Sequence, residues 1–248
     1  MDVRVHSEYL GGSDWLCMCG GGEKVRNAAR LKQVASGGRV ACFDFGYFGR
    51  STDMAVSYMR VSIDHHHPQA DIGKTKPDPS RWDKLRIVLR EDANPNGHIV
   101  VVGLGPKSRD LLSLYDWEMR ALESARRRFP GKTILYRPKR DAIRIMWEPQ
   151  DATSPIEEVL RGASLVISRH SNVACDACVA GIPVECEDGA AAWIYRDRRS
   201  PDAVRRLDFL RRLAWWQWQL GEMGAAWKFL LAVSSSTSAA GSIPLTVM

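Results

Sequence analysis

The chain has 248 residues, 45% hydrophobic and 26% charged, which fits a globular protein with a buried core and excludes disordered and fibrous classes. The sequence has neither a run of the roughly 18 apolar residues that a membrane-spanning helix needs nor an apolar secretory signal near its start. We therefore expect a cytoplasmic protein with reduced cysteines and no membrane partner. Thirty-five Lys and Arg against 29 Asp and Glu give a net charge of +6, which suits a polyanionic or phosphorylated partner.

A cluster of turn-forming residues divides the chain. Residues 92–97 combine Asp, Asn, Pro and Gly, and an apolar run begins directly after them. We expect a small N-terminal α/β lobe over residues 1–95, on the acceptor side, and a second, Rossmann-like lobe over residues 96–200. A helix over residues 201–231 and a flexible tail over residues 232–248 would follow.

The predicted elements alternate between strands and helices. In the first lobe, strands are expected at 14–18, 39–45 and 57–63, with a helix at 23–35. In the second lobe, strands at 98–103, 133–137, 164–168 and 183–186 alternate with helices at 110–129, 155–161 and 172–180, and a loop follows residue 186. This alternation predicts an α/β fold with two Rossmann-like lobes, whose parallel sheets carry helices on both faces.

The segment from Asp202 to about Leu231 reads as one long amphipathic helix. Its four tryptophans are Trp215, Trp216, Trp218 and Trp227. They cannot all lie on one narrow stripe, so part of this aromatic surface is expected to pack against another lobe. The helix would therefore bridge back to the first lobe.

The strongest functional signal lies in residues 163–186, where an apolar strand leads into a polar turn and then a helix closed by Gly181. The unpaired backbone N–H groups and the dipole at the start of such a helix favour a phosphate. The side chains of Arg169, His170, Ser171 and Asn172 add donors. The alternative is that Ser171 or Asn172 only caps the helix and that His170 is a surface residue.

Two more basic turns follow neighbouring strands: residues 103–108, with Lys107 and Ser108, and residues 137–140, with Arg137 and Lys139. The carboxyl ends of parallel strands meet at one edge of a sheet, where α/β proteins bind ligands. The turns would form an electropositive rim suited to a nucleotide diphosphate. The glycine spacing fits neither a P-loop nor a complete dinucleotide fingerprint.

The strand, polar turn, helix and segment 181–186 resemble the donor-binding half of GT-B glycosyltransferases, over residues 98–231. The resemblance implies two facing Rossmann-like lobes, a terminal helix that crosses back, and a nucleotide-sugar whose diphosphate contacts residues 169–172. Glu185 or Glu187 would bind ribose or sugar hydroxyls. It implies no metal and no cofactor, with a nucleotide-sugar, a UDP-sugar above all, as co-substrate.

The compact length and the ending over residues 211–218 are also similar to glycosyltransferase-like proteins of tailed bacteriophages. That likeness implies the host cytoplasm and DNA modification, with a hydroxymethylated pyrimidine in double-stranded DNA as the acceptor. A glycan or a small metabolite stays open as the acceptor.

In the first lobe, the glycine loop of Gly20, Gly21 and Gly22 would let a ligand approach the backbone. Asp44 lies in an apolar and aromatic stretch, where burial would raise its pKa. It could deprotonate an acceptor hydroxyl, although an Asp bonded to backbone at a strand end is an alternative. Arg50 could hold a phosphate of either substrate.

The run of His65, His66 and His67 also invites a functional reading. In an extended segment His65 and His67 would share one face, so a single catalytic or substrate-contacting histidine, His65, is favoured over a metal site. The alternative is that the run is an ordinary loop without a functional role. The cysteine pairs, Cys175 with Cys178 and Cys17 with Cys19, are expected to be core thiols.

The leading hypothesis is thus a metal-independent glycosyltransferase with Asp44 or His65 as the base. The alternatives are a sugar-nucleotide epimerase or hydrolase of the same fold, and a non-enzymatic nucleic-acid-binding protein.

Overall fold

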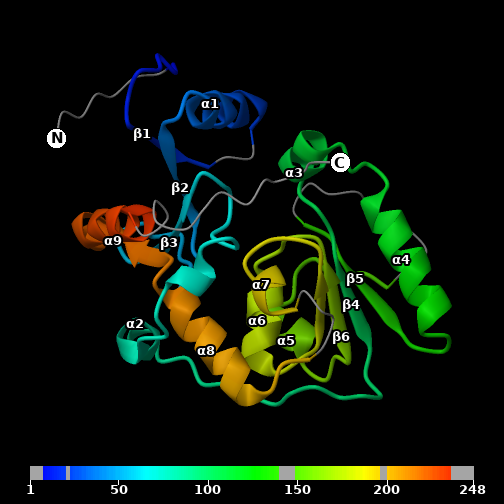
Figure 1. Ribbon diagram of the computed structural model, residues 1–248. Helices are drawn as coiled ribbons and strands as arrows, with labels where there is room; N and C mark the ends of the chain where they lie inside the picture. The colour runs from blue at the N-terminus through cyan, green and yellow to red at the C-terminus, as the bar shows by residue number, and fades with distance from the viewer. Residues whose placement is uncertain (1–7, 21–22, 140–148, 196–199, 236–248) are drawn as a thin grey trace.

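The computed structural model describes residues 8–20, 23–139, 149–195 and 200–235. It is an α/β protein with two four-stranded sheets (Figure 1). The strands are β1 (Trp15–Cys19), β2 (Arg39–Phe45), β3 (Tyr58–Ile63), β4 (Ile99–Val102), β5 (Ile134–Arg137), β6 (Leu165–Ser168), β7 (Val184–Cys186) and β8 (Gln217–Gln219). The helices are α1 (Lys24–Ala35), α2 (Pro79–Lys84), α3 (Pro106–Leu112), α4 (Trp117–Arg128), α5 (Ile156–Leu160), α6 (Val173–Ala180), α7 (Ala192–Tyr195), α8 (Ala203–Ala214) and α9 (Met223–Ser235), with short 3-10 turns η1 (Ile72–Lys74) and η2 (Leu220–Glu222).

The second sheet has the order β5-β4-β6-β7 and is parallel throughout, as predicted. Every residue of β4 and β6 is buried, which explains why β4 consists of Ile and Val alone and why β6 begins with Leu, Val and Ile. Ile99 and Val101 pack with Leu122 of α4 on one face, while Val100 and Val102 belong to the core on the other face. We call this sheet with α3–α7 the second lobe.

The first sheet has the order β1-β2-β3-β8, and we call it with α1 and α2 the first lobe. Only β1 and β2 are parallel; β3 and β8 run antiparallel to their neighbours. The prediction of parallel sheets was therefore wrong for this lobe. The connection from β2 to β3 contains no helix, and a parallel partner needs a crossover, usually helical, whereas a direct return gives an antiparallel pair.

Two long helices predicted from the sequence are each divided. The pattern over 110–129 breaks at Ser113, whose φ of 53° ends α3 in the left-handed region before α4 begins. The pattern over 202–231 contains β8, in which Trp218 pairs with Met59 of β3. The chain thus returns to the first lobe by adding a strand, and α9 then packs on β3 and β8.

Other differences are local. A short helix, α7, lies in the segment expected to be a loop, and residues 232–235 of the expected tail belong to α9, while 236–248 are outside the described residues. Cys175 and Cys178 are buried as predicted, whereas Cys17 and Cys19 are exposed because β1 is an edge strand. Across the described ranges, no helix is both long and apolar enough to cross a membrane.

Candidate functional site

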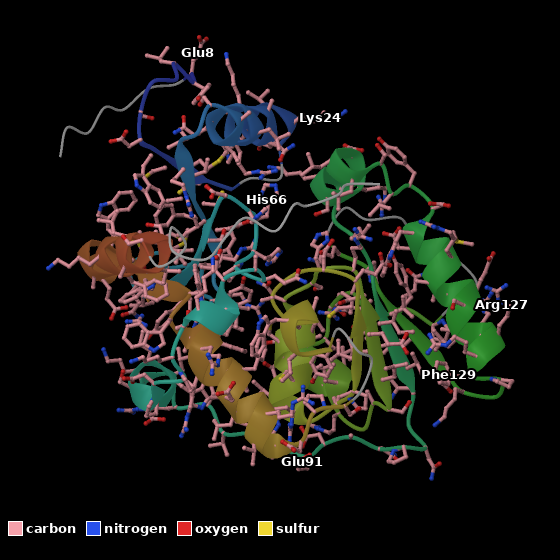
Figure 2. All side chains as sticks on the ribbon, viewed as in Figure 1. Glu8, Lys24, His66, Glu91, Arg127 and Phe129 are labelled. Atoms are coloured by element: carbon pink, nitrogen blue, oxygen red, sulfur yellow. The ribbon has the colours of Figure 1, made fainter. Side chains whose placement is uncertain are left out.

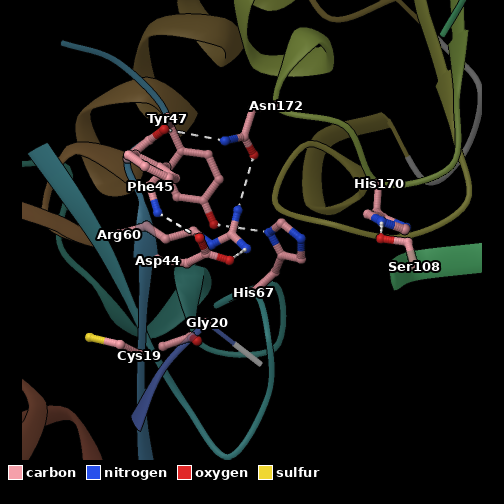
Figure 3. Close-up of polar contacts among 12 residues, drawn as sticks. Cys19, Gly20, Asp44, Phe45, Tyr47, Arg60, His67, Ser108, His170 and Asn172 are labelled. Atoms are coloured by element: carbon pink, nitrogen blue, oxygen red, sulfur yellow. Dashed lines mark hydrogen bonds and ion pairs between the residues drawn. The ribbon is translucent and has the colours of Figure 1, made fainter. Parts of the chain in front are cut away.

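The ends of the parallel strands of both sheets come together where the two lobes meet, and we use the word cleft for this region. Among the described residues, the side-chain contacts that cross it include Lys107 to Glu23 at 2.6 Å, Arg50 to Asp176 at 3.1 Å, Arg60 to Asn172 at 3.4 Å, and the rings of His67 and His170 with centroids 6.0 Å apart. Figure 3 shows Asp44, Arg60 and His67 of the first lobe near Asn172, with His170 beyond them.

Asp44 lies on the wall of the cleft that the first lobe provides. It is the register partner of Arg60 on β3, and Arg60 Nη2 lies 2.8 Å from Asp44 Oδ2. The Asp44 side chain is 38% exposed, so the prediction that it is buried was wrong. The backbone N–H of Phe45 also donates to Asp44 Oδ1 at 2.8 Å. The carboxylate is accessible and held in place from two sides.

Two of the three consecutive histidines are partly buried and bonded to residues of the first lobe. Asp64 has a φ of 60°, which ends β3 and breaks the extended segment that the prediction assumed. As a result His65 is exposed, His66 Nε2 lies 3.3 Å from Asn27 Oδ1, and His67 Nδ1 lies 3.2 Å from the Tyr47 hydroxyl. His65 is therefore more exposed to solvent than His66 and His67.

The histidines of the cleft are neutral. Burial, followed by the positive charges of Lys139, Arg169 and Arg60, lowers the pKa of His170 to about 3. Burial and nearby cations also lower the pKa of His66 to about 4 and hold that of His67 well below its usual value. At neutral pH these rings offer N–H groups and lone pairs but carry no charge.

The turns after β4 and β5 supply the cationic side of the cleft. Ser108 Oγ lies 3.0 Å from His170 Nε2, so the turns after β4 and β6 meet. Loss of surrounding water, together with the charges of Arg60 and Arg50, lowers the pKa of Lys139. Within the described part of the chain, Lys139 has no ion pair, whereas Lys107 is paired with Glu23.

Two arginines predicted to bind the diphosphate are instead occupied. Arg169 pairs with Glu187 and, at 3.0 Å, with Asp188. Arg137 pairs with Asp151 at 3.1 Å and donates to the carbonyl of Ser154 at 2.8 Å. Arg137 therefore stabilises the turn before α5, and a phosphate at Arg169 would compete with two carboxylates.

Ser171 and Asn172, which follow β6, have different roles in the structure. Ser171 Oγ accepts from the backbone N–H of Val173 at 3.3 Å, so it supports the start of α6. Asn172 makes no side-chain cap; its Nδ2 donates to the carbonyl of Gly46 at 3.2 Å. Asn172 therefore links the second lobe to the loop after β2.

A hollow of about 740 Å³ lies between α4, β6, β7 and α7. Its lining includes Arg169, Glu185 and Glu187, three of the predicted donor residues. Arg128 holds Glu185 at 2.5 Å, and Trp117 Nε1 donates to Glu187 at 2.7 Å. Ser168 is also in the lining, although its Oγ is buried and has no hydrogen-bond partner among the described residues. The hollow is large enough for a nucleoside.

A smaller hollow of about 330 Å³ lies at Arg50 and Asp176, with Arg90 and Glu157 also in its lining. Burial raises the pKa of Asp176 to about 6, against the opposing effect of Arg50. Arg50, predicted to hold a phosphate, is therefore engaged in an ion pair between the lobes.

Gly21 and Gly22 of the predicted glycine loop lie outside the described residues, while Gly20 has a φ of 65°. In the described segments, no three His, Cys, Asp or Glu side chains are grouped to hold a metal ion.

Figure 2 shows His66 near the middle of the molecule and Arg127 at its outer edge; residues 126–128 are exposed on α4. The main residue of the site that the sequence did not indicate is Arg60, because a single charged residue in an otherwise apolar strand forms no motif.

Comparison with known proteins gives a likeness of fold. No protein-family model and no curated protein matches the sequence. Among solved structures, the chain is similar to a KpsC of Thermosulfurimonas dismutans described as a beta Kdo 2,7 transferase, with a TM-score of 0.49 and 14% identity over 90% of this chain and 85% of that one. It is also similar to a KpsC of that organism described as a beta Kdo 2,4 transferase, with a TM-score of 0.47 and 12% identity over 79% and 78%.

Proposed function

We propose that the protein transfers a sugar from a nucleotide-sugar to a hydroxyl acceptor in the cleft between its lobes. The observation that carries this proposal is the position of Asp44, an accessible carboxylate oriented by Arg60. Asp44 lies near enough to Lys139 for their charges to interact, and the second lobe also brings His170 and Ser108, which are hydrogen-bonded to each other, to this region. A base on one side and an anion-binding surface on the other are what displacement of a phosphate-linked leaving group requires.

The reaction then follows from these positions. The acceptor hydroxyl attacks the anomeric carbon, the bond from that carbon to the phosphate oxygen breaks, and Asp44 takes the hydroxyl proton. The leaving phosphate keeps the electron pair, and its charge is stabilised by Lys139 and by hydrogen bonds. Lys139 is preferred over Arg60 and Arg50 for this role because each of those arginines already pairs with a carboxylate.

We assign the nucleoside end of the donor to the 740 Å³ hollow. Its indole and carboxylates can contact a base and ribose hydroxyls. Glu185, Glu187 and Arg169 remain the proposed contacts there. The base is unassigned, with uracil as the first choice to test.

Thermal unfolding with UDP, GDP, ADP, CMP and their sugars tests the donor site. At about 100 times Kd, one of these ligands should add about 2.7 kcal/mol, which raises Tm by about 5–10 °C in a chain of this length. Lys139→Ala should lose the shift, and Lys76→Ala, which changes an exposed lysine that is not one of the proposed contacts, should keep it. Arg169→Ala shows whether that residue contributes. The absence of a shift with every nucleotide would contradict the proposal.

Product analysis with the donor so identified tests the reaction. A glycosylated acceptor supports transfer, a free sugar indicates hydrolysis, and a nucleotide that carries an altered sugar indicates epimerisation. For the acceptor, duplex DNA with hydroxymethylated pyrimidines should be compared with a glycan and with small hydroxyl compounds. Transfer to DNA should fall steeply between about 50 and 200 mM salt, because phosphate contacts release counterions.

A further inference from the structure

His67 occupies a position in the cleft that the reaction proposed above does not use. Its ring follows β3 in the first lobe and lies 6.0 Å, centroid to centroid, from the ring of His170 in the second lobe. Figure 3 shows it between Arg60 and His170. A group bound at the edge of both rings would touch both lobes.

The hydrogen bond between the Tyr47 hydroxyl and Nδ1 of His67 bears on which nitrogen of His67 carries the proton. Tyr47 is fully buried, and burial raises the pKa of its hydroxyl, so it keeps its proton. Among the described residues, His67 Nδ1, at 3.2 Å, is the one hydrogen-bond partner of that hydroxyl. If Nδ1 accepts this proton, a neutral imidazole carries its own proton on Nε2.

The surroundings of His67 favour an anion. Burial and the charges of Arg60 and Lys139 lower the pKa of His67, so its ring is neutral. These same charges attract a phosphate, and Nε2 has no hydrogen-bond partner within the residues described. A neutral N–H donor can then bind a phosphate oxygen without adding another charge to a crowded cationic site.

We infer that His67 donates a hydrogen bond from Nε2 to a phosphate bound in the cleft, and that Tyr47 is the positioning residue that fixes this tautomer. The inference rests on the proposed function in one respect, that the phosphate belongs to the sugar donor. Because its one free lone pair, on Nδ1, is used by Tyr47, His67 is not the base of the reaction. That assignment leaves proton removal to Asp44.

Nitrogen-15 NMR of histidine-labelled protein tests the tautomer. The His67 signals are identified by their loss in His67→Gln, and they should show a protonated Nε2 and an unprotonated Nδ1 at pH 7. In Tyr47→Phe the two tautomers should mix, because the acceptor role of Nδ1 is no longer imposed. A proton on Nδ1 in the wild-type protein would overturn the inference.

Calorimetric titration with inorganic pyrophosphate tests the contact. A hydrogen bond to a charged group contributes about 1.5–3 kcal/mol, so His67→Ala should bind pyrophosphate about 10-fold to 100-fold more weakly. His67→Gln, whose amide N–H can replace Nε2–H, should stay within about 3-fold of wild type. His65→Gln is the matched control in the same segment and should bind as wild type does. Equal affinity in His67→Ala and wild type, or no binding to wild type, would refute the contact.

These measurements separate the inference from the proposed function. Pyrophosphate binding needs no sugar transfer, so binding through His67 in a protein that transfers no sugar would sink the proposed function alone. Sugar transfer that is unchanged in His67→Ala would remove His67 and leave the proposed function in place. Thermal unfolding without ligand confirms that each variant is folded.

Discussion

Arg60 connects Asp44 to the second lobe. Its Nη2 lies 2.8 Å from Asp44 Oδ2 across the antiparallel pair β2–β3, and its Nη1 lies 3.4 Å from Asn172 Oδ1 at the start of α6. The Arg60 side chain is only 13% exposed, so its position is fixed by packing. One guanidinium group therefore sets the orientation of the carboxylate and its distance from the opposite wall of the cleft.

Asp44→Asn should remove sugar transfer while leaving the fold intact. The amide cannot take a proton from the acceptor, and loss of a general base costs about 100-fold to 10,000-fold in rate. Because Asp44 is more than one-third exposed, its ion pair contributes little to the free energy of unfolding. Rate and Tm should be measured together, with Asp83→Asn, at an exposed site on α2, as the control. A variant that keeps more than about a tenth of the rate would exclude Asp44 as the base.

The free energy of unfolding should fall as the solution is acidified from pH 7 to pH 5. His66 and His170 have pKa values lowered to about 4 and about 3 in the folded protein, against about 6.5 when unfolded. Below pH 6.5 the unfolded chain therefore binds protons that the folded protein does not, and stability is lost until the folded values are reached. The loss at pH 5 is about 1–2 kcal/mol for each histidine.

Urea unfolding at pH 7 and pH 5 measures this loss. Replacing one of the two histidines, as in His170→Gln or His66→Gln, removes its titration from both states. Each variant should consequently lose less stability than wild type between the two pH values. Identical pH dependence in wild type and both variants would show that these histidines titrate normally.

The second lobe could be predicted closely because its strands are buried on both faces. A strand such as β4 reads as an unbroken apolar run, and turn-forming residues mark its start, so the pattern depends on local sequence alone. The division of the C-terminal helix could not be predicted in this way. Trp216 and Trp218 fit a helical pattern, and only their contacts with the first lobe, including Trp216 Nε1 to Thr75 Oγ1 at 3.0 Å, favour a strand there.

The candidate site shows the same limit. The segments that reach the cleft were identified because basic turns follow parallel strands, and Asp44, His170 and Ser108 do lie there. Whether a charged side chain of the site is free or paired depends on residues far away in the sequence. Arg169 is neutralised by Asp188, 19 positions further along the chain, and no local motif reveals that pairing.

Arg50→Ala should destabilise the protein more at pH 8 than at pH 5. Burial raises the folded pKa of Asp176 to about 6, above the unfolded value near 3.8. The protonated carboxyl group therefore stabilises the folded state fully below pH 3.8, and this contribution is lost as the pH rises through 6. At pH 8 the carboxylate is ionised and depends on Arg50, whereas at pH 5 it is largely protonated. We expect a loss of about 1–3 kcal/mol at pH 8, reduced from the value for a fully buried pair because Arg50 is 37% exposed.

The double variant Arg50→Ala with Asp176→Asn is the control for this prediction. It contains no titrating carboxyl group at that position, so the difference between pH 8 and pH 5 should shrink toward that of Asp176→Asn alone. Urea unfolding at both pH values measures all three variants. An Arg50→Ala effect that does not depend on pH would show that Asp176 is ionised throughout.

Arg81 should be the main anchor of the C-terminal segment on the first lobe. It is 6% exposed and donates to the carbonyl of Gln217 at 2.8 Å and to Glu222 at 2.9 Å. Its guanidinium lies 3.5 Å from the centroid of a Trp218 ring, which adds a cation–π contact. These bonds hold β8 and η2 against α2, and β8 completes the sheet that carries Asp44.

Arg81→Leu should therefore lower the free energy of unfolding by about 3–5 kcal/mol, because it leaves a carboxylate and buried carbonyls without their donor. Glu222→Gln keeps the shape and some hydrogen bonds, and it should cost only about 1–2 kcal/mol. Arg205→Leu, at an exposed position on α8, is the matched control and should change stability by less than about 0.5 kcal/mol. Denaturant unfolding compares the three variants. If Arg81→Leu were no worse than Arg205→Leu, the C-terminal segment would be held by its apolar contacts alone, and β8 would form without this ion pair.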